Sequence, residues 1–303
     1  MPIRESAFRQ IAWAKLNLTL EVLGRRADGF HELRSLVAFA GVGDSVEFAP
    51  QDGIGLADGF PTLDIDGPFG SGLQGPNLIL NAARAVNARI PGLVQGHFRL
   101  VKTLPVAAGL GGGSADAAAA LRLIAQSCDG SFDWGDAEAL APGLGSDVAV
   151  CLRSVPALMT GRGEIVEPVS GFPKCGVVLA NPGVALATSA VYRALSASPL
   201  AAAPEPPPPP DFAGHFEALI AYASARGNDL EPPAKSLAPE VTQVLSVLSS
   251  LEGVRLVRLS GSGATCFALF ATPREALRAS IVLAGLQPDW WITASTLEAP
   301  KTG

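Results

Sequence analysis

Apolar and polar positions alternate along residues 11–23 of the chain (IAWAKLNLTLEVL). The apolar set recurs at every second residue, which is the period of a β-strand. Lys15 and Asn17 fall two residues apart between these apolar positions, so we expect their side chains to point the same way. The pattern predicts a strand with a polar pair on an otherwise apolar element. Alternatively, Lys15 simply extends its ammonium out of a sheet edge into water.

The remainder of the N-terminal half predicts more strands and two helices. Apolar runs at 35–48 and 97–105 are typical of strands, and helical spacing over 77–88 predicts a helix. The strand at 97–105 leads into AAGLGGGSADAAAALRLIAQ, which predicts a glycine loop and then an alanine-rich helix beginning near Ser114. We interpret ALAPGLGSD (139–147) as a loop and VAVCL (148–152) as a short buried strand.

The C-terminal half predicts a second domain. Gly171-Phe172-Pro173 interrupts the pattern, which indicates domains at 1–170 and 171–303. Beyond a proline tract at 204–210, which we expect to be an exposed spacer without a catalytic role, helical patterns alternate with strands and with a turn-like GNDLEPP (227–233). The whole predicts an α+β protein, with a β-rich N-terminal domain and an α/β sandwich C-terminal domain.

The charge and the apolar content of the chain limit the kinds of binding partner that we expect. The formal net charge is −6, and no run of Lys and Arg forms a stripe for a polyanion, so we expect no nucleic-acid partner. No apolar stretch is long enough for a membrane span and no signal sequence is recognisable, which indicates a cytoplasmic protein with four reduced cysteines. We expect a small-molecule substrate, no membrane partner, and a monomer or homodimer.

The glycine loop at 109–113 is the strongest chemical signal. Its glycines let backbone approach a ligand closely, and the following helix directs unpaired N–H groups at whatever binds there, as a phosphate chain requires. No lysine follows a glycine, which excludes a Walker loop, and Ser114 replaces the third glycine of a dinucleotide fingerprint. A competing interpretation is a turn that only lets a helix pack closely.

Asp147 and the GSG turn each have a functional and a structural interpretation, whereas His31 lacks a metal-binding pattern. Asp147 follows a Gly-rich turn, where a carboxylate could be a general base or could cap its own turn. The GSG turn at 261–263 could face a ligand or be a plain hairpin turn. His31 lacks the partner residues of a zinc helix, so we predict no protein-bound metal.

Together these segments resemble the GHMP kinases, which include galactokinase, homoserine kinase and mevalonate kinase. The resemblance covers about residues 11–270 and rests on AKLNLTLEVLGRRADGFHEL, LPVAAGLGGGSADAAAAL, GSDVAVCL, GRGE, GNDLE and LSGSGATCFALF in this order. Within that family, ADGFHEL combined with GLGGGS resembles the branch that acts in non-mevalonate isoprenoid biosynthesis. The resemblance implies a two-domain fold, with a nucleotide-binding and catalytic N-terminal domain at 1–170 and a substrate-side C-terminal domain at 171–303. It also implies ATP-dependent phosphorylation of a hydroxyl on a methylerythritol linked to cytidine diphosphate.

The resemblance also implies roles for individual residues. Asp147 would accept the proton of the attacking hydroxyl, assisted by the ammonium of Lys15, and Mg²⁺ would arrive with the nucleotide. The substrate would be bound by Asn17, by Phe30 and His31 at the cytosine, by Thr188, and by Gly261 and Gly263. The ATP phosphates would lie on Pro105, Val106, Ala107, Ala108, Gly109, Leu110, Gly111, Gly112, Gly113, Ser114 and Ala115.

The sequence differs from the usual family pattern at three places. Phe30 stands where a Tyr is common, Ala115 replaces a second Ser of the phosphate loop, and the proline tract is an elaboration. Two alternative functions stay open at this point: a kinase with a homoserine-like or mevalonate-like acceptor, for which a base-binding pair has no use, and a non-catalytic nucleotide-binding protein.

Overall fold

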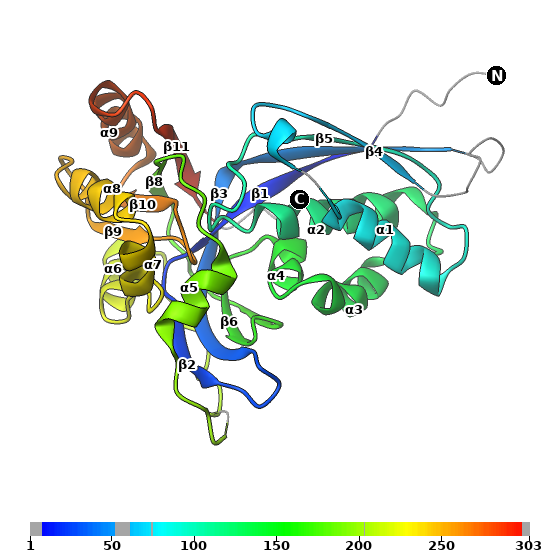
Figure 1. The fold of residues 1–303 in the computed structure, drawn as a ribbon, viewed down its shortest axis with the longest axis horizontal. Coiled ribbons are helices and arrows are strands. Elements are labelled where there is room, and N and C mark those ends of the chain that lie inside the picture. Colours follow the sequence, from blue (N-terminus) through cyan, green and yellow to red (C-terminus); the bar gives the residue numbers. More distant parts are fainter. Residues whose placement is uncertain (1–7, 52–60, 74, 203, 299–303) are drawn as a thin grey trace. The chain divides into compact units, whose positions relative to one another are not determined.

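The computed structural model describes residues 8–51, 61–73, 75–202 and 204–298 (Figure 1). The described residues cluster into two compact units. Unit 1 contains those of Met1–Ala14, Gly43–Val106 and Gly111–Arg153, and unit 2 those of Lys15–Val42, Ala107–Leu110 and Ser154–Gly303. Each unit is therefore discontinuous in sequence. The sequence-based boundary between residues 170 and 171 stays a prediction.

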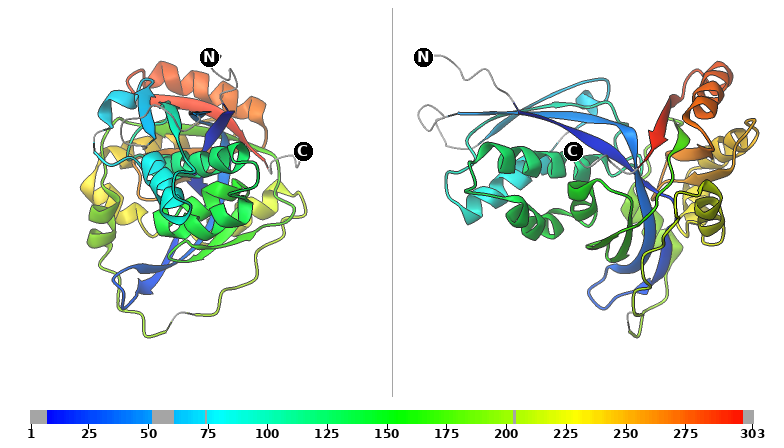
Figure 2. Two further views of the ribbon diagram at one scale, coloured as in Figure 1. Left: turned by 90° about the vertical axis from the view of Figure 1, so that its right-hand side faces the viewer. Right: turned by 180° about the vertical axis from the view of Figure 1, so that it is seen from behind.

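Unit 1 is a helical layer packed on a small sheet. In the sheet, the last part of β3 pairs antiparallel with β5, and β5 pairs parallel with β4. Helices α1 to α4 lie together on one side of these strands (Figure 2). The elements are β1 (Phe8–Asn17, up to Ala14), β3 (His31–Pro50, from Gly43), β4 (Thr62–Asp66), the 3₁₀ helix η1 (Gly70–Gly72), α1 (Leu78–Arg89), β5 (Gly96–Val101), α2 (Gly112–Ser127), α3 (Trp134–Leu144) and α4 (Val148–Arg153).

Helix α2 is the centre of unit 1. Its residues Ala117, Ala118, Ala119 and Ala120 are all fully buried, and α2 contacts α1, α3 and α4. Because alanine side chains are short, neighbouring helices can approach the α2 backbone closely. This packing fixes the N-terminal end of α2, where the predicted phosphate loop ends.

Unit 2 contains a mainly antiparallel sheet with helices packed on it. Strand β8 lies between β11 and β10, antiparallel to both, and β10 pairs with β9. Helices α8 and α9 pack on these strands. Its elements, besides the ends of β1 and β3, are β2 (Glu21–Arg25), β6 (Ala157–Gly161), β7 (Ile165–Pro168), β8 (Cys175–Asn181), α5 (Thr188–Leu195), α6 (Phe216–Ser224), α7 (Glu231–Leu237), α8 (Glu240–Ser249), β9 (Leu256–Leu259), β10 (Cys266–Phe270), α9 (Pro273–Leu286) and β11 (Trp291–Leu297).

The core of unit 2 explains why these segments fold as they do. Strand β8 is buried at every position, which matches a central strand covered on both faces. Helix α9 begins with a capping box between Thr272 and Glu275 and with Pro273 in its first turn, a combination that sets a helix start. The helix then buries Ala276, Ala279 and Leu283 against the strands.

Three local predictions are wrong. Residues 148–152 form the helix α4 rather than a strand, and α3 continues through Pro142 to Leu144 where a loop was expected. The segment interpreted as a turn, 227–233, already contains the start of α7 at Glu231. Helix α2 begins at Gly112, two residues before Ser114. None of the helices in the described part of the chain is both long and apolar enough to span a membrane.

Candidate active site

Lys15 and Asn17 stand at the end of β1, in unit 2, and both are buried, with 4% of each residue exposed. The Lys15 amide donates to the Leu110 carbonyl at 2.9 Å. The end of β1 is thereby joined to the short segment Ala107–Leu110 of the predicted phosphate loop, which belongs to the same unit. The alternative that Lys15 extends into water from an exposed edge is not what the structure shows.

The side-chain amide of Asn17 has its nitrogen hydrogen-bonded and its oxygen without a donor among the described residues. Its Nδ2 donates to Ser35 Oγ at 2.8 Å, and Ser35 Oγ in turn donates to the Thr19 carbonyl at 2.6 Å. Asn17 Oδ1 is buried and accepts no hydrogen bond from any described residue. Because a buried acceptor without a donor is costly, Oδ1 is suited to a donor from a ligand.

The GSG turn contacts the glycine loop within unit 2. Ser260 Oγ donates to the Gly109 carbonyl at 2.9 Å, and the Thr265 amide donates to the Ala108 carbonyl at 3.1 Å. A Cβ on Gly261 would stand 3.2 Å from Asn17 Oδ1. The turn is therefore more than a hairpin connection, because it joins Asn17 and the segment Ala107–Leu110 in one cluster.

Thr188 reaches the same turn from α5. Its Oγ1 lies 2.8 Å from Ser262 Oγ, so the two hydroxyls share a hydrogen bond. Thr188 is the first residue of α5. Unit 2 thus brings together, from four separate segments of sequence, most of the residues that the resemblance assigns to substrate.

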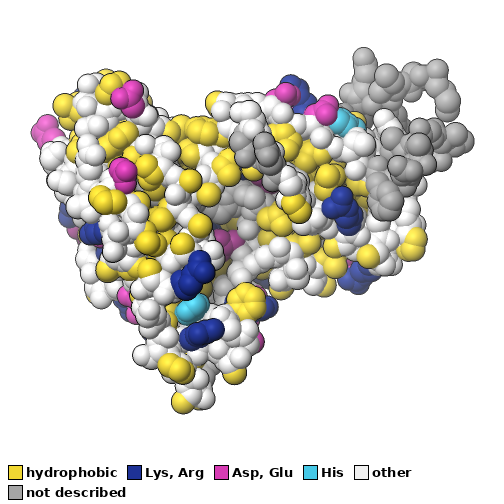
Figure 3. All heavy atoms as spheres, viewed as in Figure 1, with side chains coloured by type: hydrophobic (Ala, Val, Ile, Leu, Met, Phe, Trp, Pro, Cys, Tyr) yellow, Lys and Arg dark blue, Asp and Glu magenta, His cyan; other side chains and the backbone are white. Residues whose placement is uncertain are grey.

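The predicted base-binding pair lies among rings and cations of unit 2. Phe30 is 49% exposed, and the guanidinium of Arg162 lies 4.8 Å from its ring centroid. The His31 ring lies 4.8 Å from the Tyr192 ring with 30° between their planes. On the face drawn in Figure 3, a histidine side chain is flanked by basic side chains near β2 and α5. An exposed aromatic beside a cation is a suitable surface for a base.

The charge state of His31 follows from its surroundings. Burial of the imidazole, reinforced by the nearby Arg25 guanidinium, lowers the pKa of His31 below its usual value. The ring is therefore neutral at pH 7 and offers one donor and one acceptor nitrogen. Such a ring can hydrogen-bond an uncharged base without adding charge.

Tyr192 is a candidate that sequence reasoning missed. No helix is predicted from the sequence at residues 182–195, although Val191 and Leu195 follow Thr188 at the three- and four-residue spacing of a helix. That spacing was the available signal. Helix α5 places Tyr192, one turn after Thr188, beside His31.

The rest of the glycine loop belongs to unit 1. Gly111 caps α2 with a left-handed backbone, at φ 63° and ψ 18°. The first turn of α2 contains Gly112, Gly113 and Ser114, whose amide groups have no partner within the helix. Gly145, two residues before Asp147, comes near Ser114, since a Cβ there would stand 3.8 Å from Ser114 Oγ.

Asp147 lies at the N-terminal end of α4 and is half-buried. Its carbonyl accepts the Cys151 amide at 3.0 Å, the first bond of this helix. Asp147 belongs to unit 1 and Lys15 to unit 2. That Lys15 assists Asp147 in the reaction therefore stays a prediction. Among the described residues, no group of three or more His, Cys, Asp or Glu side chains is placed to hold a metal ion.

Comparisons with known proteins agree with this arrangement. The description "GHMP kinases N terminal domain" matches residues 77–154, and "GHMP kinases C terminal" matches residues 212–281. The first match contains α1 to α4 with the glycine loop, and the second contains the GSG turn. The chain is a GHMP kinase with the two-domain α+β fold of that family.

Relatives define the group within the family. The chain is 48% identical to a 4-diphosphocytidyl-2-C-methyl-D-erythritol kinase of Parvibaculum lavamentivorans, over 94% of this chain and 97% of the relative. It is 47% identical to the kinase of the same name from Xanthobacter autotrophicus, over 95% and 98% of the two chains. The chain therefore belongs to the family of the 4-diphosphocytidyl-2-C-methyl-D-erythritol kinases.

Solved structures show the same relationship. A crystal structure of 4-(cytidine 5'-diphospho)-2C-methyl-D-erythritol kinase is 32% identical, with a TM-score of 0.74 over 97% of this chain and all of that one. A homoserine kinase from Cytophaga hutchinsonii is similar at a TM-score of 0.70 over 99% and 96% of the two chains, with 16% identity. The second likeness concerns the fold alone.

Proposed function

We propose that the chain transfers a phosphoryl group from ATP to a hydroxyl of 4-diphosphocytidyl-2-C-methyl-D-erythritol, a reaction of non-mevalonate isoprenoid precursor biosynthesis. The observation that carries the proposal is the cluster in unit 2, where β1, the segment Ala107–Leu110, the GSG turn and α5 are joined by hydrogen bonds. The names and high coverage of the relatives support the choice of acceptor.

The donor nucleotide is proposed to lie with its phosphates on residues 105–115. Amide groups in the first turn of α2 and the positive end of its dipole favour negative charge there. Transfer of a phosphoryl group needs little covalent chemistry from the protein, so positioning and charge stabilisation supply most of the catalysis. Mg²⁺ would enter with the nucleotide, since it binds mainly to phosphates and water in such sites.

The acceptor is proposed to lie on the cluster of unit 2. Asn17 Oδ1, which has no donor among the described residues, would accept a hydrogen bond from the substrate. Asp147 would take the proton of the attacking hydroxyl, and the Lys15 ammonium would offset negative charge that develops during transfer. Thr188 and the GSG turn would complete the contacts with the acceptor.

The cytosine is proposed to bind at Phe30 and His31. The half-exposed Phe30 ring offers a stacking face although it lacks a tyrosine hydroxyl, and the neutral His31 offers hydrogen bonds. The pair Phe30 and His31 favours an acceptor that contains a base over a small alcohol. Tyr192, which packs on His31, would keep its ring in place.

An ADP-release assay with the purified chain tests the acceptor. We expect ATP-dependent turnover with 4-diphosphocytidyl-2-C-methyl-D-erythritol and background rates with homoserine and mevalonate. Turnover with either small alcohol, but not with the cytidyl substrate, would contradict the proposal. ATP binding without turnover on any of the three would instead favour a non-catalytic nucleotide-binding protein.

Replacing His31 by Ala tests the base-binding site. Because the neutral imidazole would bind the cytosine and not the reacting hydroxyl, the variant should raise the acceptor KM by about tenfold or more, with kcat changed far less. Steady-state kinetics at saturating ATP measure both constants. His215→Ala, at the start of α6, is the matched control and should leave the acceptor KM unchanged. An unchanged acceptor KM in His31→Ala would remove the base-binding assignment.

A further inference from the structure

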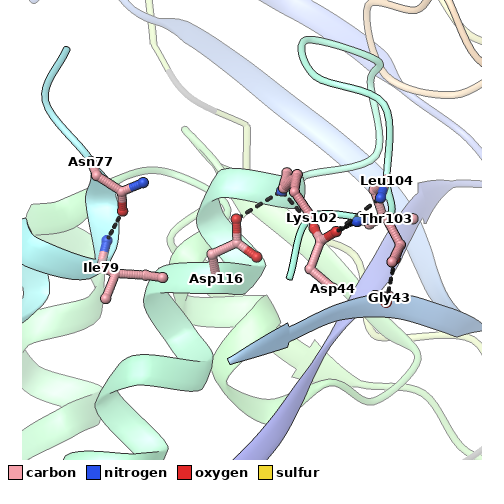
Figure 4. Close-up of polar contacts among 8 residues, drawn as sticks. All are labelled: Gly43, Asp44, Asn77, Ile79, Lys102, Thr103, Leu104 and Asp116. Carbon is pink, nitrogen blue, oxygen red and sulfur yellow. Dashed lines mark hydrogen bonds and ion pairs between the residues drawn. The ribbon is translucent and has the colours of Figure 1, made fainter. Parts of the chain in front are cut away.

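Three buried charged residues form a cluster in unit 1 (Figure 4). Lys102 Nζ lies 2.5 Å from Asp44 Oδ2 and 2.7 Å from Asp116 Oδ2. The exposed fractions are 3% for Lys102, 0% for Asp44 and 3% for Asp116. The residues come from β3, from the segment after β5 and from α2, so no short sequence motif predicts that they meet.

The cluster is costly as a purely structural feature. With both carboxylates ionised it carries one excess negative charge, and burial of charge carries a large desolvation penalty that apolar residues would avoid. Asp44 is well satisfied, because its Oδ1 accepts the amides of Thr103 at 2.6 Å and Leu104 at 2.8 Å. Asp116 Oδ1 is buried and accepts no hydrogen bond from any described residue. The Asp116 carboxylate is therefore the under-satisfied member.

The position of the cluster relates it to the phosphate loop. Thr103 and Leu104, bound by Asp44, directly precede the loop at 105–115, and Asp116 directly follows it. Lys102 Nζ stands 3.0 Å from where a Cβ of Gly112 would be. The ammonium thus lies close to the first residue of α2 while it bridges the two carboxylates. The two ends of the loop both lie in unit 1, and the ion pairs of Lys102 with Asp44 and Asp116 hold them.

We propose that Lys102, Asp44 and Asp116 are positioning residues that hold the first turn of α2 for the nucleotide phosphates, and that the affinity for ATP depends on the charge of this cluster. The inference rests on the proposed function only in taking residues 105–115 as the phosphate site. Glycine at position 112 fits this role, since a Cβ there would stand 3.0 Å from the ammonium and require it to shift.

The protonation of Asp116 supports a dependence on charge. Burial is the main cause that raises the pKa of Asp116 to about 7; Lys102 opposes the rise and Asp44 adds to it. Burial also acts against the charge on Lys102, yet Asp116 and Asp44 raise the pKa of Lys102 above its usual value. Deprotonation of Asp116 in the neutral pH range therefore adds one negative charge to the cluster.

Several other charged groups on α2 and on the helices that pack against it are engaged elsewhere. On α1 and α3, Arg89 pairs with Asp136 at 2.7 Å and Arg84 binds Asn81. Arg153 of α4 pairs with Glu138 of α3 at 2.9 Å. Arg122, on α2 itself, donates to the carbonyls of Ile11, Cys151 and Leu152.

The sign of the effect follows from the charges. Phosphates bound on the first turn of α2 repel an ionised Asp116 and so favour its protonated form. Binding of ATP should therefore take up a proton near pH 7, and the affinity for ATP should fall as the pH rises from 6 to 8. We expect the protonated Asp116 to keep its contact with Lys102, so that the first turn of α2 stays in place.

Calorimetric titration of the chain with ATP and saturating Mg²⁺, without acceptor, tests the inference. For the wild type we expect Kd to rise by about threefold or more between pH 6 and pH 8, and proton uptake in buffers of different ionisation enthalpy. Asp116→Asn, a neutral residue of the same shape, should remove both the proton uptake and most of the change in Kd. Glu138→Gln is the matched control and should behave as the wild type.

A second variant tests the positioning role. Lys102→Met in the Asp116→Asn background leaves only the amide-bound Asp44 charged, and it should weaken ATP binding more than Asp116→Asn does, with the change in KM for ATP exceeding that in kcat. If the Kd for ATP has the same pH dependence in the wild type and in Asp116→Asn, and the chain still turns over its acceptor, the inference about the cluster is wrong while the proposed function stands. Absence of ATP binding in the wild type would overturn this inference together with the proposed function.

Discussion

Replacement of Asp147 by Asn is expected to lower kcat by about two orders of magnitude or more while ATP still binds. The amide has nearly the shape of the carboxylate, so the N-terminal end of α4, where the Asp147 carbonyl accepts the Cys151 amide, should stay intact. What the variant loses is the only group that we assign as acceptor of the hydroxyl proton. The measurement is kcat from the ADP-release assay, beside Kd for ATP from titration.

The matched control is Asp129→Asn. Asp129 is exposed and has a positive φ of 43°, a backbone conformation that Asn also accepts. This variant changes the same charge in the same unit and should leave kcat within about twofold of the wild type, as surface substitutions usually do. If Asp147→Asn turned over as fast as Asp129→Asn, the general-base role would be wrong, although the family membership would stand.

Most of the fold could be predicted because the strands of this chain have a clear period. The alternation at 11–23 corresponds to β1 and β2, separated by a short break, and the run at 35–48 lies within β3. The wrong predictions lie where local patterns are ambiguous. Residues 148–152 are five apolar residues in succession, a run that has no period and that fits a buried helix as well as a strand. The structure makes it the short helix α4.

Proline misled the prediction of two other helices. Pro142 suggested a loop, yet α3 starts with a capping box between Asp133 and Asp136 and continues past the proline for two residues. Pro142 cannot donate to the carbonyl four residues earlier, which costs the helix one hydrogen bond, and the packing of α3 against α4 and α2 favours the continuation. In α7 the prolines lie in the first turn, where the missing N–H has no helical acceptor anyway.

The candidate site could be predicted only as far as short motifs extend. The glycine loop, the GSG turn and the positions of Lys15 and Asn17 are visible in the sequence because each is a local pattern. Contacts between distant segments are not: Asp44 and Lys102 are 58 residues apart, and each alone is an ordinary charged residue. Tyr192 was hidden for the same reason, since its partner His31 lies on a different segment.

Replacement of Gly109 by Ala should have the second large effect. Gly109 has a φ of 74°, which an L-residue with a side chain rarely adopts, and a Cβ there would overlap the Ser260 carbonyl oxygen and lie 2.8 Å from the Gly263 amide nitrogen. Both obstacles are backbone atoms, so the methyl group can be accommodated only if the glycine loop and the GSG turn separate. Since the same separation removes the Ser260 to Gly109 hydrogen bond, we expect a loss of about 1–3 kcal/mol in the free energy of unfolding.

The functional consequence distinguishes this variant from a merely destabilised chain. Asn17 and Thr188 depend on the GSG turn for their position, so kcat/KM for the acceptor should fall by about a hundredfold at temperatures where the chain is fully folded, because a displacement of about 1 Å costs that much. Gly285→Ala is the matched control: that residue lies in α9, with no atom within 4 Å of an added Cβ, and alanine there should slightly raise stability without changing turnover. Thermal denaturation and acceptor kinetics on the two variants make the comparison. Gly109→Ala with the stability and turnover of Gly285→Ala would show that the contact between the two loops has no role in the reaction.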